Sequence, residues 1–209
     1  LIEGDLITSI SKKIQFDSDT QVIDAHGLIL IPGMIDDQVH FREPGLTHKG
    51  NILSESKAAI AGGVTSYIEM PNTSPNTTTV EEFNKKISIA SINSYSNFSF
   101  MFGGTNDNLD EIKKIDPTEV AGIKLFLGSS TGKMLIDNLN SIEKIFSSTS
   151  LPISAHCEDE QTIRYNSKKY KEIYGENVPM ELHPKIRSEE ACYKSSKYAV
   201  DLAKKTGAR

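Results

Sequence analysis

Residues 32–44 read Pro-Gly-Met-Ile-Asp-Asp-Gln-Val-His-Phe-Arg-Glu-Pro, and this stretch joins a strand pattern to a set of reactive side chains. After an apolar start, polar side chains occupy every second position: Asp36, Gln38, His40 and Arg42. Because strand side chains alternate between two faces, these four are expected to share one face. A carboxylate, an amide, an imidazole and a guanidinium make a poor core. The pattern therefore indicates a site for a metal ion and an anion.

Short apolar runs alternate with helical patterns along the rest of the chain. The expected strands cover residues 35–40, 64–70, 98–102, 122–127 and 152–156. The expected helices cover residues 52–61, 80–93, 109–115, 141–147, 158–174 and 188–205. Glycine and proline punctuate the junctions, as turn residues should. Repeated strand-then-helix units imply a parallel sheet, either doubly wound or closed into a barrel.

The polar residues at the strand ends favour the barrel. No Gly-x-Gly-x-x-Gly follows the first strand, which argues against dinucleotide binding. In a (β/α)₈ barrel the active site lies at the carboxyl ends of several strands. The residues that would form it are Gln38, His40, Arg42, Asn72, Lys124 and His156. We therefore predict an α/β fold in which residues 32–209 form the first five to six βα units of a partial (β/α)₈ TIM-type barrel.

The N-terminal segment has a different pattern. Short strands are expected at residues 6–10, 21–24 and 28–31, separated by turn-forming glycines. We predict that residues 1–31 are a remnant of a small β-sandwich domain. The chain starts without methionine and stops just after a helix pattern, so a fragment at both ends is expected.

Composition excludes several classes of function. The net charge of −5 over 209 residues leaves no basic footprint for nucleic acid. No apolar run approaches the ~18–20 residues that cross a bilayer, and no secretory signal is visible. Two cysteines do not suggest a disulfide framework. A cytoplasmic protein without nucleic-acid or membrane partners is expected.

Besides Gln38, five residues are candidates for binding a metal or a substrate. His40 and His156 each end an apolar strand, where imidazole suits zinc and similar metals. Lys124 lies mid-strand, where three interpretations are open: a buried ion pair, a lysine whose stem is buried while its charged head reaches water, or a lysine of lowered pKa that captures carbon dioxide as a carbamate. Arg42 can pair with a carboxylate and Asn72 with amide groups, although Asn72 in Met-Pro-Asn-Thr is equally a turn residue.

Several motifs, taken in order along the chain, resemble the dihydroorotases of the amidohydrolase superfamily. They are Pro-Gly-Met-Ile-Asp, Val-His-Phe-Arg-Glu-Pro-Gly, Ala-Gly-Gly-Val-Thr, Met-Pro-Asn-Thr, Gly-Ile-Lys-Leu-Phe and Ala-His-Cys-Glu. The resemblance implies a zinc-dependent hydrolase of cyclic amide C–N bonds. It would interconvert N-carbamoyl-L-aspartate and L-dihydroorotate in de novo pyrimidine biosynthesis, using a metal-activated hydroxide. The expected partner is a small substrate carrying a carboxylate and a cyclic amide, and a homodimer is one possible assembly.

The resemblance also assigns roles to individual residues. His40 matches the second histidine of a His-x-His pair, His156 the first histidine of the second metal site, and Lys124 the carboxylated lysine that bridges two zinc ions. Arg42 and Asn72 match the groups that hold the substrate carboxylate.

The chain departs from the family pattern at Gln38, which stands where the first histidine belongs, so that metal site is expected to be weak or empty. The family's fourth histidine and its catalytic aspartate are expected beyond Arg209, so this chain alone is expected to be inactive. Two alternatives stay open. One is a hydantoinase or allantoinase, and the other is a non-catalytic, dihydroorotase-like scaffold protein.

Overall fold

The computed structural model of the protein describes residues 1–128 and 134–209. The chain divides into two compact units, Leu1–Pro32 and Gly33–Arg209. The first unit holds a two-stranded antiparallel sheet of β1 (Ile2–Glu3) and β2 (Leu6–Ile7). All the candidate site residues belong to the second unit.

The strands expected at residues 21–24 and 28–31 do not form. The apolar side chains of Ile23 and Ile29 are 81% and 87% exposed. A strand needs a neighbour to pair its backbone groups, and two strands of two residues each offer little in this unit to pair with. A β-sandwich is therefore not seen in residues 1–31.

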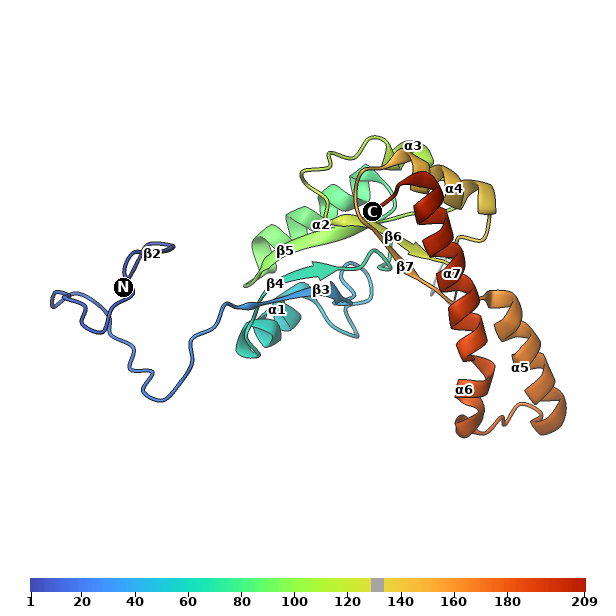
Figure 1. Cartoon of the computed structure of the whole chain (residues 1–209), viewed down its shortest axis with the longest axis horizontal. Coiled ribbons are helices and arrows are strands. Elements are labelled where there is room, and N and C mark those ends of the chain that lie inside the picture. Colours follow the sequence, from blue (N-terminus) through green and yellow to red (C-terminus); the bar gives the residue numbers. More distant parts are fainter. Residues whose placement is uncertain (129–133) are drawn as a thin grey trace. The chain divides into compact units, whose positions relative to one another are not determined.

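The second unit is built on a five-stranded parallel sheet (Figure 1). Its strands are β3 (Met34–Val39), β4 (Val64–Glu69), β5 (Asn97–Gly103), β6 (Gly122–Phe126) and β7 (Ile153–His156). The order in space, β3-β4-β5-β6-β7, is the order in the chain. In a doubly wound sheet the spatial order of the strands reverses at one point along the chain. In a barrel, each strand lies beside the strand that precedes it in the sequence. The expected parallel α/β architecture is thus present, with strand order of the barrel type.

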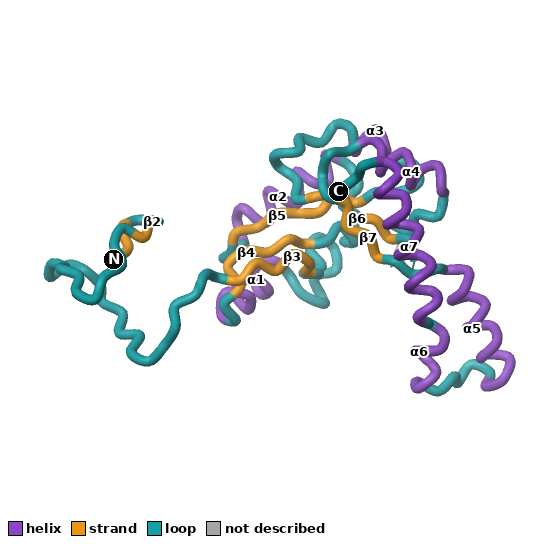
Figure 2. The backbone as a smooth tube through the Cα atoms, viewed as in Figure 1, coloured by secondary structure: helices purple, strands orange, loops and turns teal. Residues whose placement is uncertain are grey.

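Helices follow the strands along the chain (Figure 2). They are α1 (Ile52–Ala61), α2 (Val80–Asn93), α3 (Leu109–Ile112), α4 (Leu139–Ser148), α5 (Glu160–Tyr174), the 3₁₀ turn η1 (Met180–Leu182), α6 (His183–Ile186) and α7 (Glu189–Thr206). Several begin at a capping side chain that accepts a backbone N–H: Thr79 for α2, Asp159 for α5 and Ser188 for α7. None of the helices in these described ranges is long and apolar enough to cross a bilayer.

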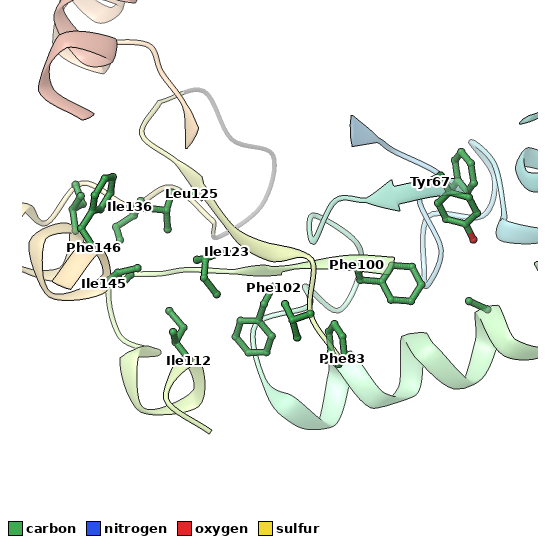
Figure 3. Close-up of a cluster of buried hydrophobic side chains, with 14 of the residues drawn as sticks. Tyr67, Phe83, Phe100, Phe102, Ile112, Ile123, Leu125, Ile136, Ile145 and Phe146 are labelled. Carbon is green, nitrogen blue, oxygen red and sulfur yellow. The ribbon is translucent and has the colours of Figure 1, made fainter. Parts of the chain in front are cut away.

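The core of the second unit lies around β5 and β6 (Figure 3). Phe100, Phe102, Ile123 and Leu125 of these strands are fully buried. Phe83 of α2 meets the ring of Phe100 edge-on, with the ring centroids 6.2 Å apart. Burying such a side chain stabilises the fold by about 1.5–3 kcal/mol, so this cluster fixes the two central strands, one of which carries Lys124.

Strand β3 contains an irregularity that changes the expected alternation of faces. Asp36 pairs with Tyr67 but Val39 pairs with Glu69, so β3 has one more residue than β4 over this interval. The Asp36 carboxylate accepts the backbone N–H of Gln38 at 3.1 Å and stabilises the irregularity. Asp36 therefore supports the backbone, and strict period-2 alternation does not run unbroken from Asp36 to Arg42.

Candidate active site

Most of the candidate residues lie at or near the carboxyl ends of the strands, where a barrel places its active site. Gln38 is in β3, and His40 is the first residue after that strand. Asn72 is the third residue after the end of β4. Lys124 is in the middle of β6 and His156 is the last residue of β7.

Asn72 fixes the ring of His40. The Asn72 Oδ1 atom lies 2.8 Å from His40 Nδ1, and because an amide oxygen can only accept, the His40 Nδ1–H donates. Burial and the positive charge of Arg42 lower the pKa of His40, which favours the neutral imidazole. The Nε2 lone pair of His40 is then left for a ligand. The structure thus gives Asn72 an orienting contact that the sequence did not predict.

Lys124 is 3% exposed, although it carries an amine. Its Nζ lies 3.4 Å from Gln38 Oε1 and 5.3 Å from the centre of the Phe126 ring. Within the described part of the chain, no carboxylate pairs with it. Burial lowers the pKa of Lys124, so its amine loses a proton more easily than that of an exposed lysine.

His156 lies in a hydrogen-bonded chain of its own. Its Nε2 donates to Glu158 Oε2 at 2.7 Å, and the same oxygen accepts from Arg187 at 2.5 Å. Burial raises the pKa of Glu158, but the hydrogen bonds from His156 and Arg187 and the charge of Arg187 outweigh it, so that the pKa is lowered overall. The ionised carboxylate holds the ring and leaves Nδ1 of His156 for a ligand.

The structure joins the candidates in pairs. Gln38 contacts Lys124 and His40 contacts Asn72, whereas no hydrogen bond in the described ranges joins His156 to His40 or Lys124. Among the described residues, no three His, Cys, Asp or Glu side chains converge on a metal position. Imidazole nitrogens nevertheless suit a borderline metal such as zinc. Each of the two imidazoles is oriented by a hydrogen-bonding partner, and Lys124 is buried.

A cavity of about 430 Å³ opens beside the Arg42 side chain. It is lined by Arg42, Leu46, Lys49, Asn72, Thr73, Ser74, Pro75 and Asn76. This lining contains two cations, several amides and hydroxyls, and no acidic side chain. Such a surface selects for an anion. Lys49 was not predicted, although a basic residue seven positions after Arg42 in a glycine-containing loop is visible in the sequence.

Comparison with solved structures places the fold in a known class. An L-hydantoinase (dihydropyrimidinase) from Arthrobacter aurescens superposes with a TM-score of 0.80 at 28% identity, over 85% of this chain and 40% of that one. A D-hydantoinase (dihydropyrimidinase) from a Thermus species gives 0.66 at 27% identity over the same shares. The described sheet is therefore a curled half-barrel of the kind found in hydantoinases.

Sequence comparison identifies the family. The model of dihydro-orotase-like proteins matches residues 27–167. A dihydroorotase from Methanosphaera stadtmanae is 37% identical over 82% of this chain and 39% of its own length. One from Methanosarcina acetivorans is 34% identical over 90% and 40%. The chain belongs to the dihydro-orotase-like family, which confirms the resemblance seen in the sequence, and it spans about two fifths of the length of these relatives.

Proposed function

We propose that the protein is a dihydroorotase, which interconverts N-carbamoyl-L-aspartate and L-dihydroorotate in pyrimidine biosynthesis. The observation that carries this proposal is the cavity lined by Arg42, Lys49 and Asn72 without an acidic side chain. Dihydroorotate carries a carboxylate beside its cyclic amide, whereas the uncharged rings of hydantoin and dihydrouracil would leave these cations without a partner. The names of the dihydroorotase relatives agree with this choice.

Three of the cavity residues have distinct tasks in binding the substrate. The planar guanidinium of Arg42 presents paired N–H donors to both oxygens of a carboxylate. Asn72 uses its Oδ1 for His40, so its NH₂ group is left to donate to the substrate. Lys49, which is exposed, adds positive charge at the rim and attracts the anion.

His40, Lys124 and His156 are the residues that would hold a divalent metal such as zinc. The metal would supply a Lewis acid and lower the pKa of water. Lys124 is suited to carboxylation, in which its neutral amine adds to carbon dioxide, an N–C bond forms and a proton is released. Gln38 offers only an amide oxygen, which binds zinc weakly, so a metal position that depends on it would be weak or empty.

Replacing Arg42 by Gln in the full-length gene product tests the proposal. We expect the wild type to hydrolyse dihydroorotate in preference to hydantoin, dihydrouracil and allantoin. Arg42→Gln should raise KM for dihydroorotate by about tenfold or more, because a charged hydrogen bond of about 1.5–3 kcal/mol is lost. Lys57→Gln is the matched control, since it removes one exposed cation of α1 outside the cavity and should leave KM unchanged.

Two other results would contradict the proposal. A preference for hydantoin, dihydrouracil or allantoin would assign the site to a sister cyclic amidohydrolase. The protein would be a non-catalytic scaffold if it turned over none of these substrates and held less than one equivalent of metal per chain by elemental analysis. Gln38 is the residue that suggests this alternative, because its amide oxygen binds zinc weakly.

A further inference from the structure

Two buried charged side chains pair with each other next to the backbone of Arg42. Glu69, the last residue of β4, is 1% exposed, and Lys86, on the buried face of α2, is 0% exposed. They form an ion pair, and Lys86 Nζ also donates to the carbonyl oxygen of Met70 at 2.9 Å. The ammonium lies 4.9 Å from the centre of the Phe100 ring.

Stability alone gives a weak reason for this pair. Burial raises the pKa of Glu69 and lowers the pKa of Lys86, and each charge opposes the shift of the other. The free-energy cost of removing two charges from water offsets most of the attraction between them. A buried pair therefore stabilises a fold no better than well-packed apolar side chains. The contacts that the pair makes with the neighbouring backbone point to a different role.

One of these contacts holds the backbone of Arg42. The Arg42 N–H donates to Glu69 Oε1 at 3.3 Å, and Arg42 has a φ of 72°. A residue with a large side chain rarely adopts this left-handed conformation unless its surroundings hold it there. The Arg42 carbonyl in turn accepts from Leu46 at 3.0 Å. The turn that directs the Arg42 side chain is therefore tied to Glu69.

The other contact holds the loop that carries Asn72. Lys86 fixes the carbonyl of Met70, two residues before Asn72, and the Met70 N–H donates to Val39 at 3.0 Å. Lys86 also neutralises Glu69. As a result, the acceptor for the Arg42 N–H brings no net negative charge close to the cavity, and the guanidinium charge is available to an anionic ligand.

We propose that Glu69 and Lys86 form a neutral, buried brace that positions Arg42 and Asn72 for the carboxylate of the substrate. Both are positioning residues, because they act through the two loops and not on the substrate. What this inference says of the substrate rests on the proposed function, while the brace itself rests on the contacts just described.

Two double variants of the full-length gene product isolate the contact with Arg42. Glu69→Gln with Lys86→Met is uncharged and keeps an oxygen for the Arg42 N–H. Glu69→Met with Lys86→Met is also uncharged but has no acceptor. We expect the second to raise KM for dihydroorotate about tenfold with kcat within about twofold of wild type, as expected when binding is lost without loss of chemistry. The first keeps the acceptor for the Arg42 N–H but loses the Lys86 hydrogen bond to the Met70 carbonyl, so its KM should lie between that of the wild type and that of the second.

Melting temperature and tryptic cleavage after Arg42 separate positioning from stability. The variant without an acceptor should be cleaved faster after Arg42 than the Gln variant, as measured by mass spectrometry of the first cut. Equal KM values for the two doubles, even with different melting temperatures, would show a merely structural pair and overturn the proposal. Glu69→Leu with Lys86→Met serves as the acceptor-free variant if the Met version does not fold.

A failure of the proposed function can be told apart from a failure of the brace. If the wild type neither binds nor hydrolyses dihydroorotate, the proposed function fails, and the cleavage rates still test the brace. Equal cleavage rates for the two doubles would overturn it.

Discussion

Glu158 is the residue on which the order of the His156 region depends. Its carboxylate accepts hydrogen bonds from His156 and Arg187, and its pKa lies below the ordinary value of 4.5. A carboxyl group whose pKa is lower in the folded chain adds stability above its unfolded-state pKa. That stability is lost as the pH falls through the folded-state pKa.

Glu158→Gln should therefore lower the free energy of unfolding by about 1 kcal/mol near neutral pH, after allowance for partial exposure. The deficit relative to wild type should shrink as the pH falls below 4.5, where the wild-type carboxyl takes up its proton. Urea unfolding at a series of pH values measures both. Glu176→Gln is the control, because Glu176 is 86% exposed in its pair with Lys171 and should contribute little. A deficit that does not change with pH would contradict the prediction.

Single residues also show how far sequence reasoning reaches into the site. His40, Lys124 and His156 could be placed at or within strands because each interrupts an apolar run. The ion pair of Glu69 and Lys86 could not, since nothing in the sequence says which face of α2 meets the end of β4. Arg187 was missed for a similar reason, because the contact between it and Glu158 depends on how the segments after β7 fold back.

At the scale of elements, helix α2 shows how local signals and packing cooperate. Thr79 caps its first turn by accepting the N–H of Glu82 at 3.2 Å, and Phe83, Lys86 and Ala90 form its buried face. The helix predicted over residues 80–93 has these bounds in the structure, and its cap and acidic first turn are local signals that agree with them. The helix carries Lys86, so its stability bears on the site as well as on the fold.

Thr79→Ala should lower the free energy of unfolding by about 1 kcal/mol, because the first-turn N–H of Glu82 loses its acceptor. Ser88→Ala removes a hydroxyl from the exposed middle of the same helix and should be neutral or slightly stabilising, since alanine has the higher helix propensity. Thermal or urea unfolding of the two variants compares them directly. A Thr79→Ala protein as stable as Ser88→Ala would show that the cap contributes nothing.

Strands were predicted well where a partner exists and poorly where none does. Residues 98–102 are apolar except for Ser99 and lie in β5, between β4 and β6. Residues 28–31 are as apolar but remain unpaired. The extra residue in β3 was also invisible, because it is defined only by the register with β4. Local pattern gives the tendency to form a strand, and pairing decides the outcome.

At the scale of the whole molecule, the two units should differ in how well they protect their backbone amides. Strand β5 is paired with a strand on both sides and belongs to the buried core that includes Phe83. Residues 21–31, in contrast, have few backbone hydrogen bonds and exposed side chains. Hydrogen exchange of the 209-residue chain should be slow in β5 and β6 and fast in residues 21–31. Slow exchange in residues 21–31 would show that the strands expected there do form.

The strand order of the sheet also bears on how the chain is made. Because β3 to β7 stand in the order of synthesis, each new strand can pair with one that has already left the ribosome. Each of β4 to β7 extends an edge that already exists, which keeps the loops closed at each of these steps short. The protein can therefore fold vectorially, and His40 and Asn72, from the first two strands, can meet before Lys124 and His156 have been translated.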